Sequence, residues 1–203
     1  MTTKWRGYSQ IDSGNHSTVQ RTVYVETEND NYFENNKPAH NGEVLENGFQ
    51  QWRNSDGLLH RGPAVIRPNG SQEWFQDDQR HRLDGPAVIG VDGTEEWYVN
   101  GQRHRIDGPA WIVDDGSQLW YVNGQRHRLG GPAVIWAGGS QEWYVCGQRH
   151  RIDGPAVIWI DGTQEWFVRG QNITRNVIHW MQPQNITWPW DLTTQMQFQL
   201  TWT

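Results

Sequence analysis

Short runs of β-branched and aromatic residues alternate with glycine-containing turns along most of this chain. In the segment 86–105, Ala87 to Val91 is one such run and Thr94 to Val99 is another. Asp92-Gly93 separates the two runs, and Asn100-Gly101 follows the second. Asp-Gly and Asn-Gly between strand-like runs are strong hairpin signals because these residues tolerate positive φ. The pattern therefore predicts two successive β-hairpins in this segment.

The same pattern returns every 23 residues. The residues that mark this period are Pro63, Pro86, Pro109, Pro132 and Pro155; Trp74, Trp97, Trp120, Trp143 and Trp166; and His81, His104, His127 and His150. A fixed period of this length indicates a repeat architecture, in which each unit is stabilised by stacking on its neighbours. We expect an all-β protein whose tandem 23-residue β-hairpin repeats form one elongated twisted sheet, with non-repetitive caps at both ends.

The period divides the chain into three segments. Residues 1–41 are expected to form an N-terminal cap with a degenerate repeat, 42–171 the array of repeats, and 172–203 a C-terminal cap. In the C-terminal cap, Ile173 to Met181 is predicted to be a short helix. Gln195 to Thr203 alternates strictly between apolar and polar residues, which predicts a half-buried strand.

The length of the turns sets which side chains share a face. With two-residue loops at both turns, Val88 faces Trp97 and Trp97 faces His104. Tyr98 then faces Arg103 on the other side. Because a short repeat has little else of comparable size to bury, we expect the repeated Trp residues to be largely buried, and each His to stack on the Trp of its own repeat.

The repeat unit reads GPAVIxxDGTQEWYVNGQRHRxD and resembles the MORN repeat, in the form HRxDGPA…DG…EWY.NG that many bacteriophage and giant-virus proteins carry. The resemblance covers roughly residues 42–171, over which Gly-Pro-Ala, Asp-Gly, Glu-Trp-Tyr/Phe and Arg-His-Arg recur in constant order. It implies a sheet of hairpins used as a scaffold or binding surface, in a family of which some members are reported to touch lipids. It also implies a viral origin.

Composition and charge limit the classes of binding partner and the cellular locations that we expect for this protein. The formal net charge of −6 disfavours general binding of nucleic acid or of anionic membranes, which depends on a dense cationic surface. No stretch is long and apolar enough for membrane insertion. The single cysteine, Cys146, excludes an intramolecular disulfide and fits a reducing compartment. We expect a cytoplasmic protein, located in the host cytoplasm if it is encoded by a virus.

The sequence predicts no catalytic residues, no metal site and no cofactor. The series His81, His104, His127 and His150 places one imidazole in each repeat, with no Cys or carboxylate converging on the same point, so metal binding is not expected. Cys146 occupies a turn position without a dedicated base. The adjacent pair Glu95-Glu96 points to opposite faces of a strand, which prevents joint acid and base action.

Departures from the repeat unit mark the candidate binding residues. Gly130 and Leu119 replace an Asp and a Glu of the unit, so Arg126 and Arg128 are expected to be the least neutralised arginines. Other off-pattern or basic positions nearby complete the candidate set, namely Trp136, Trp159, Arg149 and Arg151. The two Trp residues are expected either to form an exposed binding hot spot or to be buried beneath the C-terminal tail.

Three functions are consistent with these features. The first is a non-enzymatic protein-interaction module, namely a virus-encoded accessory protein that binds and blocks or recruits a host protein, such as a component of host defence. The second is sequestration of an anionic small molecule or nucleotide along the Arg and His positions. The third is an enzyme whose site lies in the non-repetitive termini. Homo-oligomerisation stays open.

Overall fold

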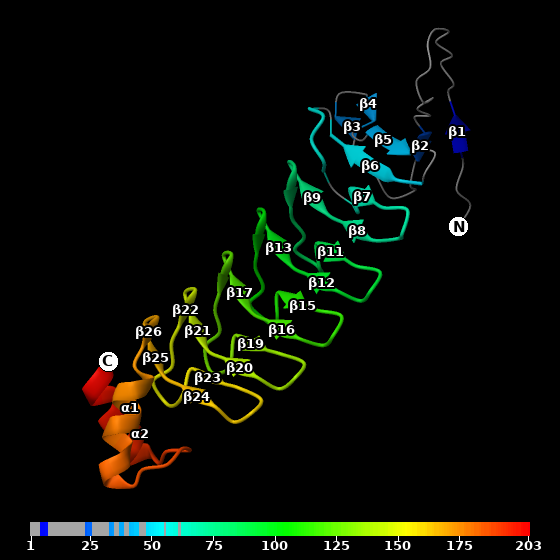
Figure 1. Cartoon of the computed structure of the whole chain (residues 1–203). Helices are drawn as coiled ribbons and strands as arrows, with labels where there is room; N and C mark the ends of the chain where they lie inside the picture. Colours follow the sequence, from blue (N-terminus) through cyan, green and yellow to red (C-terminus); the bar gives the residue numbers. More distant parts are fainter. Residues whose placement is uncertain are drawn as a thin grey trace, which may run out of the picture. The chain divides into compact units, whose positions relative to one another are not determined.

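The structure is a computed structural model that describes residues 48–54, 56–60 and 62–203 in full. It also describes the backbone of the strands that precede them, which are β1 (Trp5–Gly7), β2 (Val23–Val25), β3 (Phe33–Glu34), β4 (Lys37–Pro38) and β5 (Asn41–Val44). The chain forms two compact units, Met1–Gln102 and Arg103–Thr203. Short antiparallel strands make up both units, and helices follow only the last described repeat (Figure 1).

In the first unit, the strands of the main sheet pair in chain order with antiparallel neighbours. They are β5, β6 (Gln50–Arg53), β7 (Val65–Ile66), β8 (Gln72–Glu73), β11 (Val88–Ile89) and β12 (Glu95–Glu96). A second, smaller hairpin follows β8 and consists of β9 (Phe75–Gln76) and β10 (Gln79–Arg80). Strand β13 (Tyr98–Val99) follows β12, and β14 (Gln102–Arg103) spans the end of this unit.

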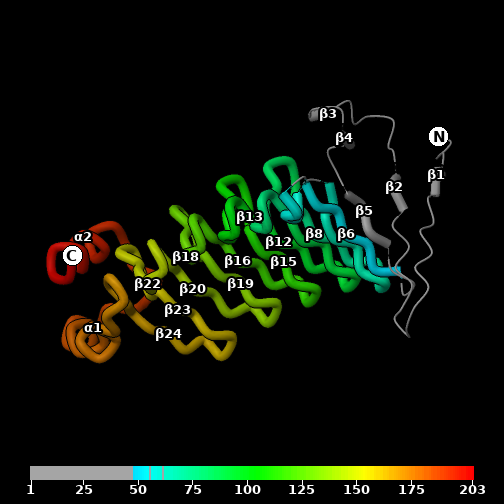
Figure 2. Tube along the Cα trace, turned by 90° about the horizontal axis from the view of Figure 1, so that it is seen from above, coloured from blue at the N-terminus to red at the C-terminus, as the bar shows by residue number. Residues whose placement is uncertain are grey.

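The second unit repeats the same arrangement (Figure 2). Its main-sheet strands are β15 (Trp111–Ile112), β16 (Gln118–Leu119), β19 (Val134–Ile135), β20 (Gln141–Glu142), β23 (Val157–Ile158) and β24 (Gln164–Glu165). The smaller hairpins pair β17 (Tyr121–Val122) with β18 (Gln125–Arg126), β21 (Tyr144–Val145) with β22 (Gln148–Arg149), and β25 (Phe167–Val168) with β26 (Gln171–Asn172). The predicted all-β architecture of repeated hairpins in a long antiparallel sheet is confirmed.

The first turn of each repeat is longer than predicted, and this changes the pairing. Val88 pairs with Glu96, and not with Trp97. The loop contains three residues, because the Gly90 N–H donates to the Thr94 carbonyl at 2.8 Å and Gly93 has a φ of 92°. Asp-Gly suits this loop as well as a two-residue loop, since both need a glycine with positive φ. A shift of one residue exchanges the two faces of the strand, so Val shares its face with Glu.

The second turn has the predicted two residues. In the second unit, Tyr121 pairs with Arg126 and Val122 with Gln125, which leaves Asn123 and Gly124 as the loop. Both loop residues have positive φ, 49° and 74°, as a type I′ turn requires. This turn therefore places Tyr and Arg side by side on one face of two small hairpins of the second unit, as Tyr121 with Arg126 and Tyr144 with Arg149.

The sequence predicted that each histidine stacks on the tryptophan of its repeat, but the stacking partners that the structure shows on Trp74, Trp120 and Trp143 are arginines. The guanidinium of Arg128 lies 3.9 Å from the centre of the Trp120 ring, and Arg151 lies 4.0 Å from that of Trp143. A guanidinium gains from the negative face of an indole, so the arginine takes the position predicted for the imidazole. Trp120 is buried, while Trp143 is half-buried.

Each histidine holds the turn of the next repeat. The Nδ1 atom of His127 accepts a hydrogen bond from the Cys146 backbone N–H at 3.2 Å, and His150 Nδ1 accepts from the Arg169 N–H at 3.1 Å. These donors are backbone groups, so the bond persists although the turn residue changes. An accepting Nδ1 requires the neutral tautomer that is protonated at Nε2.

The C-terminal cap contains two α-helices, where the sequence predicted one helix and one strand. Helix α1 (Thr174–Met181) agrees with the prediction, and a 3-10 turn η1 (Gln182–Gln184) follows it. The predicted strand at Gln195 to Thr203 is wrong, because this segment belongs to helix α2 (Leu192–Trp202). Asp191 caps α2 by accepting a hydrogen bond from the Thr194 N–H at 2.7 Å.

The alternating pattern of α2 has a simple helical interpretation. The apolar residues are two positions apart, so each lies four positions from the next but one. The pairs Met196/Leu200 and Phe198/Trp202 therefore lie on two different faces of the helix. Phe198 is fully buried in a cluster with Trp166, whereas Met196 and Leu200 are 64% and 87% exposed. Strict alternation is therefore compatible with a helix that buries only one of its two apolar faces.

The tail packs on the last repeat through tryptophans. The rings of Trp166 and Trp190 are stacked with centroids 6.1 Å apart, and the Arg151 guanidinium lies 5.1 Å from the centre of the Trp188 ring. Trp188 lies against Gly154, where a Cβ atom would overlap the indole. The absence of a side chain at this glycine is what allows the tail to approach.

We expect Gly154→Ala to weaken the attachment of the tail and to cost about 1–3 kcal/mol of unfolding free energy, as overpacking of a tight contact does. The matched control is Gly131→Ala, in which the added Cβ meets only the movable end of Arg128, whose Cζ is 3.1 Å away. Urea denaturation followed by tryptophan fluorescence measures both variants. Equal midpoints for the two variants would contradict the role given to Gly154.

Candidate functional site

A buried carboxylate lies at the same position of several repeats and organises one face of the array. Glu73 and Glu142 are 2% and 3% exposed, which requires their charges to be paired. In the first unit, Glu73 forms ion pairs with Arg67 and Arg80. In the last repeat, Glu165 accepts from the Trp159 indole N–H at 2.7 Å. We call this position of the repeat the carboxylate position.

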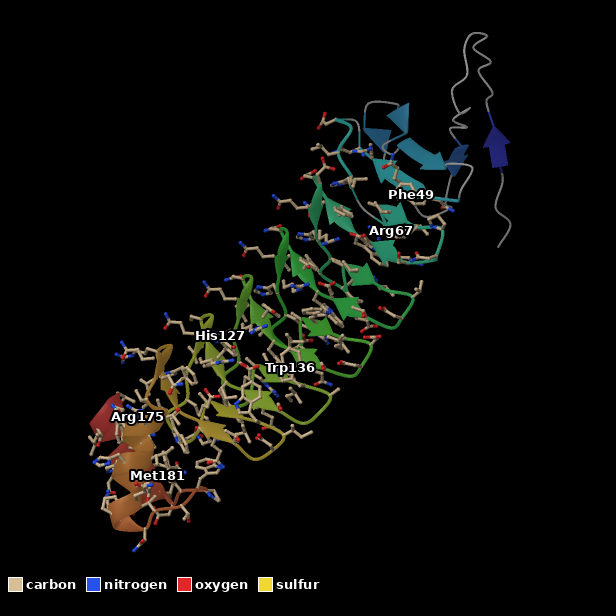
Figure 3. All side chains as sticks on the ribbon, in the orientation of Figure 1. Phe49, Arg67, His127, Trp136, Arg175 and Met181 are labelled. Atoms are coloured by element: carbon tan, nitrogen blue, oxygen red, sulfur yellow. The ribbon has the colours of Figure 1, made fainter. Side chains whose placement is uncertain are left out.

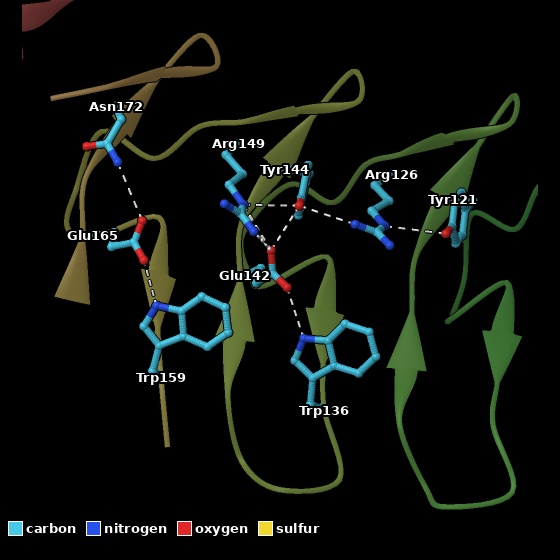
Figure 4. A network of polar contacts seen from close by, with 9 residues as sticks. All are labelled: Tyr121, Arg126, Trp136, Glu142, Tyr144, Arg149, Trp159, Glu165 and Asn172. Atoms are coloured by element: carbon cyan, nitrogen blue, oxygen red, sulfur yellow. Dashed lines mark hydrogen bonds and ion pairs between the residues drawn. The ribbon is translucent and has the colours of Figure 1, made fainter. Parts of the chain in front are cut away.

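Glu142 shows the most complete set of contacts (Figure 4). It accepts hydrogen bonds from the Trp136 indole N–H at 2.9 Å, from the Tyr144 hydroxyl at 2.9 Å and from Arg149 Nη2 at 2.8 Å. Burial alone favours the neutral acid, but these bonds and the charge of Arg149 outweigh it. The pKa of Glu142 therefore lies below its ordinary value, and the group is a carboxylate at neutral pH.

The residue six positions before the carboxylate donates to it in three repeats. It is the apolar Val113 in the repeat where Leu119 replaces the carboxylate, and it is Gly90 in the repeat that contains Glu96. The donating pairs are Arg67 with Glu73, Trp136 with Glu142, and Trp159 with Glu165. Sequence reasoning missed this link, although the six-residue spacing between the off-pattern Trp and the Glu is visible in the sequence. Trp136 and Trp159 thus donate hydrogen bonds to the carboxylates of their own repeats.

The repeat with Leu119 keeps its arginine without a carboxylate. Arg126 donates from Nε to the Tyr121 hydroxyl at 3.4 Å and from Nη1 to the Tyr144 hydroxyl at 3.2 Å. Among the residues that the structure describes in full, Arg126 has no ion pair, whereas Arg149 at the equivalent position pairs with Glu142. Burial acts to lower the pKa of Arg126, but the bonds to the two phenols outweigh it and the pKa is raised. The group therefore stays charged.

Arg128 has lost its carboxylate as well. The equivalent arginines 82, 105 and 151 each pair with an Asp two residues later, and Gly130 stands at that position here. Arg128 lies over Trp120 and donates from Nη1 to the Pro132 carbonyl at 3.0 Å. This repeat thus carries two half-buried guanidinium groups that lack a carboxylate partner in the fully described part of the chain.

The six candidate residues fall into two sets of contacts. Four of them contact the carboxylates and phenols shown in Figure 4, namely Arg126, Trp136, Arg149 and Trp159. The other two, Arg128 and Arg151, lie over tryptophan rings instead. The structure therefore does not bring Arg126 and Arg128 into one cluster, although the sequence singled them out together.

The two off-pattern tryptophans differ from the tryptophans under the tail. Trp136 is 36% exposed, and Trp159 is half-buried beside Ala156 and Val157. The cluster that joins the tail to the array contains Trp166 and Trp190 but neither Trp136 nor Trp159. The tail thus leaves Trp136 accessible, and Figure 3 shows it in the middle of the second unit's hairpins.

His150 makes the stability of the second unit depend on pH. Desolvation by burial, and then the charge of Arg169, hold the pKa of His150 below its ordinary value. As the pH falls, His150 therefore becomes protonated in the unfolded chain at a higher pH than in the folded chain. The stabilising contribution is present above about pH 6.5, the ordinary pKa of histidine, and is lost as the pH falls through the lower folded pKa.

We therefore expect the urea midpoint of the wild type to fall between pH 7 and pH 5, and to fall less in His150→Gln. The control is His179→Gln, because His179 is exposed on α1. This control is expected to keep the full pH dependence. A wild-type midpoint that does not change over this range would contradict the assignment.

Within the fully described residues, no three His, Cys, Asp or Glu side chains converge as metal ligands would. No described helix combines the length and the apolar character needed to cross a membrane. No protein-family model matches the chain, and a search of curated proteins finds no match either.

Proposed function

We propose that this chain is a non-enzymatic protein-interaction module that binds an acidic surface of a partner protein through the second unit. The observation that carries the proposal is the loss of both carboxylate partners in one repeat. Arg126 and Arg128 keep their charges where Leu119 and Gly130 replace the acids of the unit. Unpaired guanidinium groups attract carboxylates, which bind them through two parallel hydrogen bonds.

Two further features support a protein as the partner. The indole of Trp136 is partly exposed and is held in place by its bond to Glu142, and an immobilised Trp beside Arg is typical of binding hot spots. The repeats offer a row of such side chains on regular strands, which costs little conformational entropy on binding. The resemblance of the repeat to that of phage and giant-virus proteins supports an accessory protein that blocks or recruits a host protein.

Affinity capture from a lysate of the native host tests the proposal. The double variant Arg126→Glu with Trp136→Ala is expected to lose a partner that the wild type retains, by at least tenfold in recovered amount. The control is Arg175→Glu, which makes the same charge change on the exposed surface of α1 (Figure 3). Melting curves on the same samples establish that each variant is folded.

The outcome separates the proposal from the alternatives. Equal capture by the wild type and a folded double variant would refute the interface on the second unit. Co-purification of an anionic small molecule, with no protein retained, would favour sequestration of that molecule over a protein-interaction module.

A further inference from the structure

We propose that Arg126 and the Tyr121 hydroxyl form a binding site for a carboxylate supplied by an acidic side chain of the partner protein. The proposal rests on the proposed function and specifies its chemistry. It assigns to a partner residue the role of hydrogen-bond acceptor that the chain's own carboxylates have in other repeats. The geometry of those repeats is the template, and Leu119 leaves the donors of this repeat without an acceptor from the chain.

The template is the repeat that contains Glu142. One carboxylate there accepts from a tyrosine hydroxyl, from an arginine of the small hairpin, and from an indole N–H. The tyrosine is two residues after the carboxylate, and the arginine is seven residues after it. Tyr121 and Arg126 stand at these two spacings from Leu119, so two of the three donors of the template are retained, while the indole donor and the acceptor are missing.

The retained donors are incompletely used. The Arg126 guanidinium donates two hydrogen bonds, both to phenol oxygens, and Nη2 donates none. The Tyr121 oxygen accepts one of these bonds, and its own proton has no acceptor among the fully described residues. By contrast, the Tyr144 hydroxyl donates to Glu142 at 2.9 Å. The pair formed by Arg126 and Tyr121 therefore has unused donors, and the charge of Arg126 has no carboxylate partner among the fully described residues.

Leu119 fills the space of the carboxylate but provides no acceptor for these donors. It is 1% exposed and packs with Trp120, Val134 and Tyr144, so its methyl groups stabilise the core without accepting any hydrogen bond. Arg126 and Tyr121 are only half-buried, so an acceptor can approach them from solvent. Figure 4 shows Arg126 between the two phenols, with its outer nitrogen not engaged.

The site favours an anion over a neutral acceptor. Arg126 is fully charged at neutral pH, and Coulomb attraction in a partly desolvated site strengthens its bonds to an anionic oxygen. A carboxylate presents two oxygens in one plane, which can accept from Arg126 and from Tyr121 together. Pyrophosphate offers anionic oxygens from a different source, so the experiment contains both.

The test is calorimetric titration of the full chain with hexaglutamate and, separately, with pyrophosphate, both at low ionic strength. Leu119→Glu places the chain's own carboxylate at the site, and we expect it to weaken hexaglutamate binding at least tenfold. Arg126→Gln is expected to do the same by removing the charge. The matched controls are Leu119→Met, which keeps the apolar volume, and Arg175→Gln, which removes an equal charge on α1; both are expected to bind as the wild type does.

The variants also distinguish loss of the site from loss of the fold. Leu119→Glu is expected to melt no lower than Leu119→Met, because Arg126 and Tyr121 are available to its carboxylate. If Leu119→Glu does not fold, Arg126→Gln decides, since it leaves the core unchanged. Wild-type affinity for hexaglutamate in folded Arg126→Gln overturns the proposal, and so does binding of pyrophosphate alone.

Failure of the site and failure of the interface give different results. If Leu119→Glu loses hexaglutamate but captures the partner as the wild type does, the carboxylate site stands and the interface lies elsewhere. If partner capture depends on Trp136 but not on Leu119 or Arg126, the interface stands and the carboxylate site is refuted.

Discussion

Replacement of Trp120 by Ala is expected to lower the free energy of unfolding by about 3–5 kcal/mol, as truncation of a buried aromatic side chain does. The indole is 8% exposed, lies under the Arg128 guanidinium, and belongs to one cluster with Ala133, Val134 and Tyr144 of the following repeat. Loss of the ring therefore leaves a cavity and also weakens the coupling between adjacent repeats.

Urea denaturation measures this loss. The control is Leu129→Ala in the same repeat, where the side chain is 77% exposed and a change within about 0.5 kcal/mol is expected. A midpoint for Trp120→Ala equal to that of the wild type would show that the tryptophans do not hold the repeats together.

Replacement of Glu142 by Leu is expected to cost about 3 kcal/mol, because one change leaves the Trp136 N–H, the Tyr144 hydroxyl and Arg149 without their common acceptor. The value is at the lower end for a broken buried ion pair, since Arg149 is half-buried and its charge is able to turn toward water. The measurement is again the free energy of unfolding in urea at pH 7.

The array itself supplies the compensating change. Val113 and Leu119 show how a repeat is built without the carboxylate, so the double variant Trp136→Val with Glu142→Leu copies a combination that the chain already uses. We expect the double variant to be more stable than Glu142→Leu alone by about 1 kcal/mol, as the unsatisfied indole N–H disappears. Strict additivity of the two single changes would show that the two positions do not act as a pair.

The acid side of the stability profile follows from the same contacts. Burial acts to raise the pKa of Glu73, but hydrogen bonds from Arg80 and Arg67 and their charges outweigh it and hold the pKa below its ordinary value. The pKa of Glu142 is likewise below its ordinary value, because its hydrogen bonds and the charge of Arg149 outweigh burial. Both groups therefore stabilise the fold above about pH 4.3, and this contribution is lost as the pH falls through the lower folded pKa.

The 23-residue period was sufficient to predict the fold of the array, because every hairpin repeats the same turn residues in the same order. It was not sufficient to predict the register. Asp92-Gly93 is compatible with loops of two or three residues, and only the pairing of Val88 with Glu96 shows which one forms. The strand predicted for the segment of α2 was wrong for a related reason. Apolar residues at every second position fit one face of a strand, but every other one of them is four residues away, which also fits one face of a helix.

The candidate site was predictable in part. The replacements at Leu119 and Gly130 are visible in the sequence and directed attention to Arg126 and Arg128. The role of Trp136 was not visible, because it depends on a hydrogen bond to a carboxylate six residues later on the same face, and that face was assigned only after the register was known. The sequence also did not show that Arg126 contacts phenols whereas Arg128 contacts an indole.

Each repeat histidine binds the backbone N–H of the next turn, and this bond forms whichever side chain the turn residue carries. Asn123, Cys146 and Arg169 occupy this position in successive repeats of the second unit, and each has a left-handed backbone that the histidine of the preceding repeat holds. Substitution at this position therefore keeps the backbone bond between adjacent repeats, while it replaces the additional side-chain contact that Asn123 Oδ1 and Cys146 Sγ make with a histidine. Cys146 is exposed, so a fluorophore or spin label attached to its thiol would report on binding from a fixed place on the backbone.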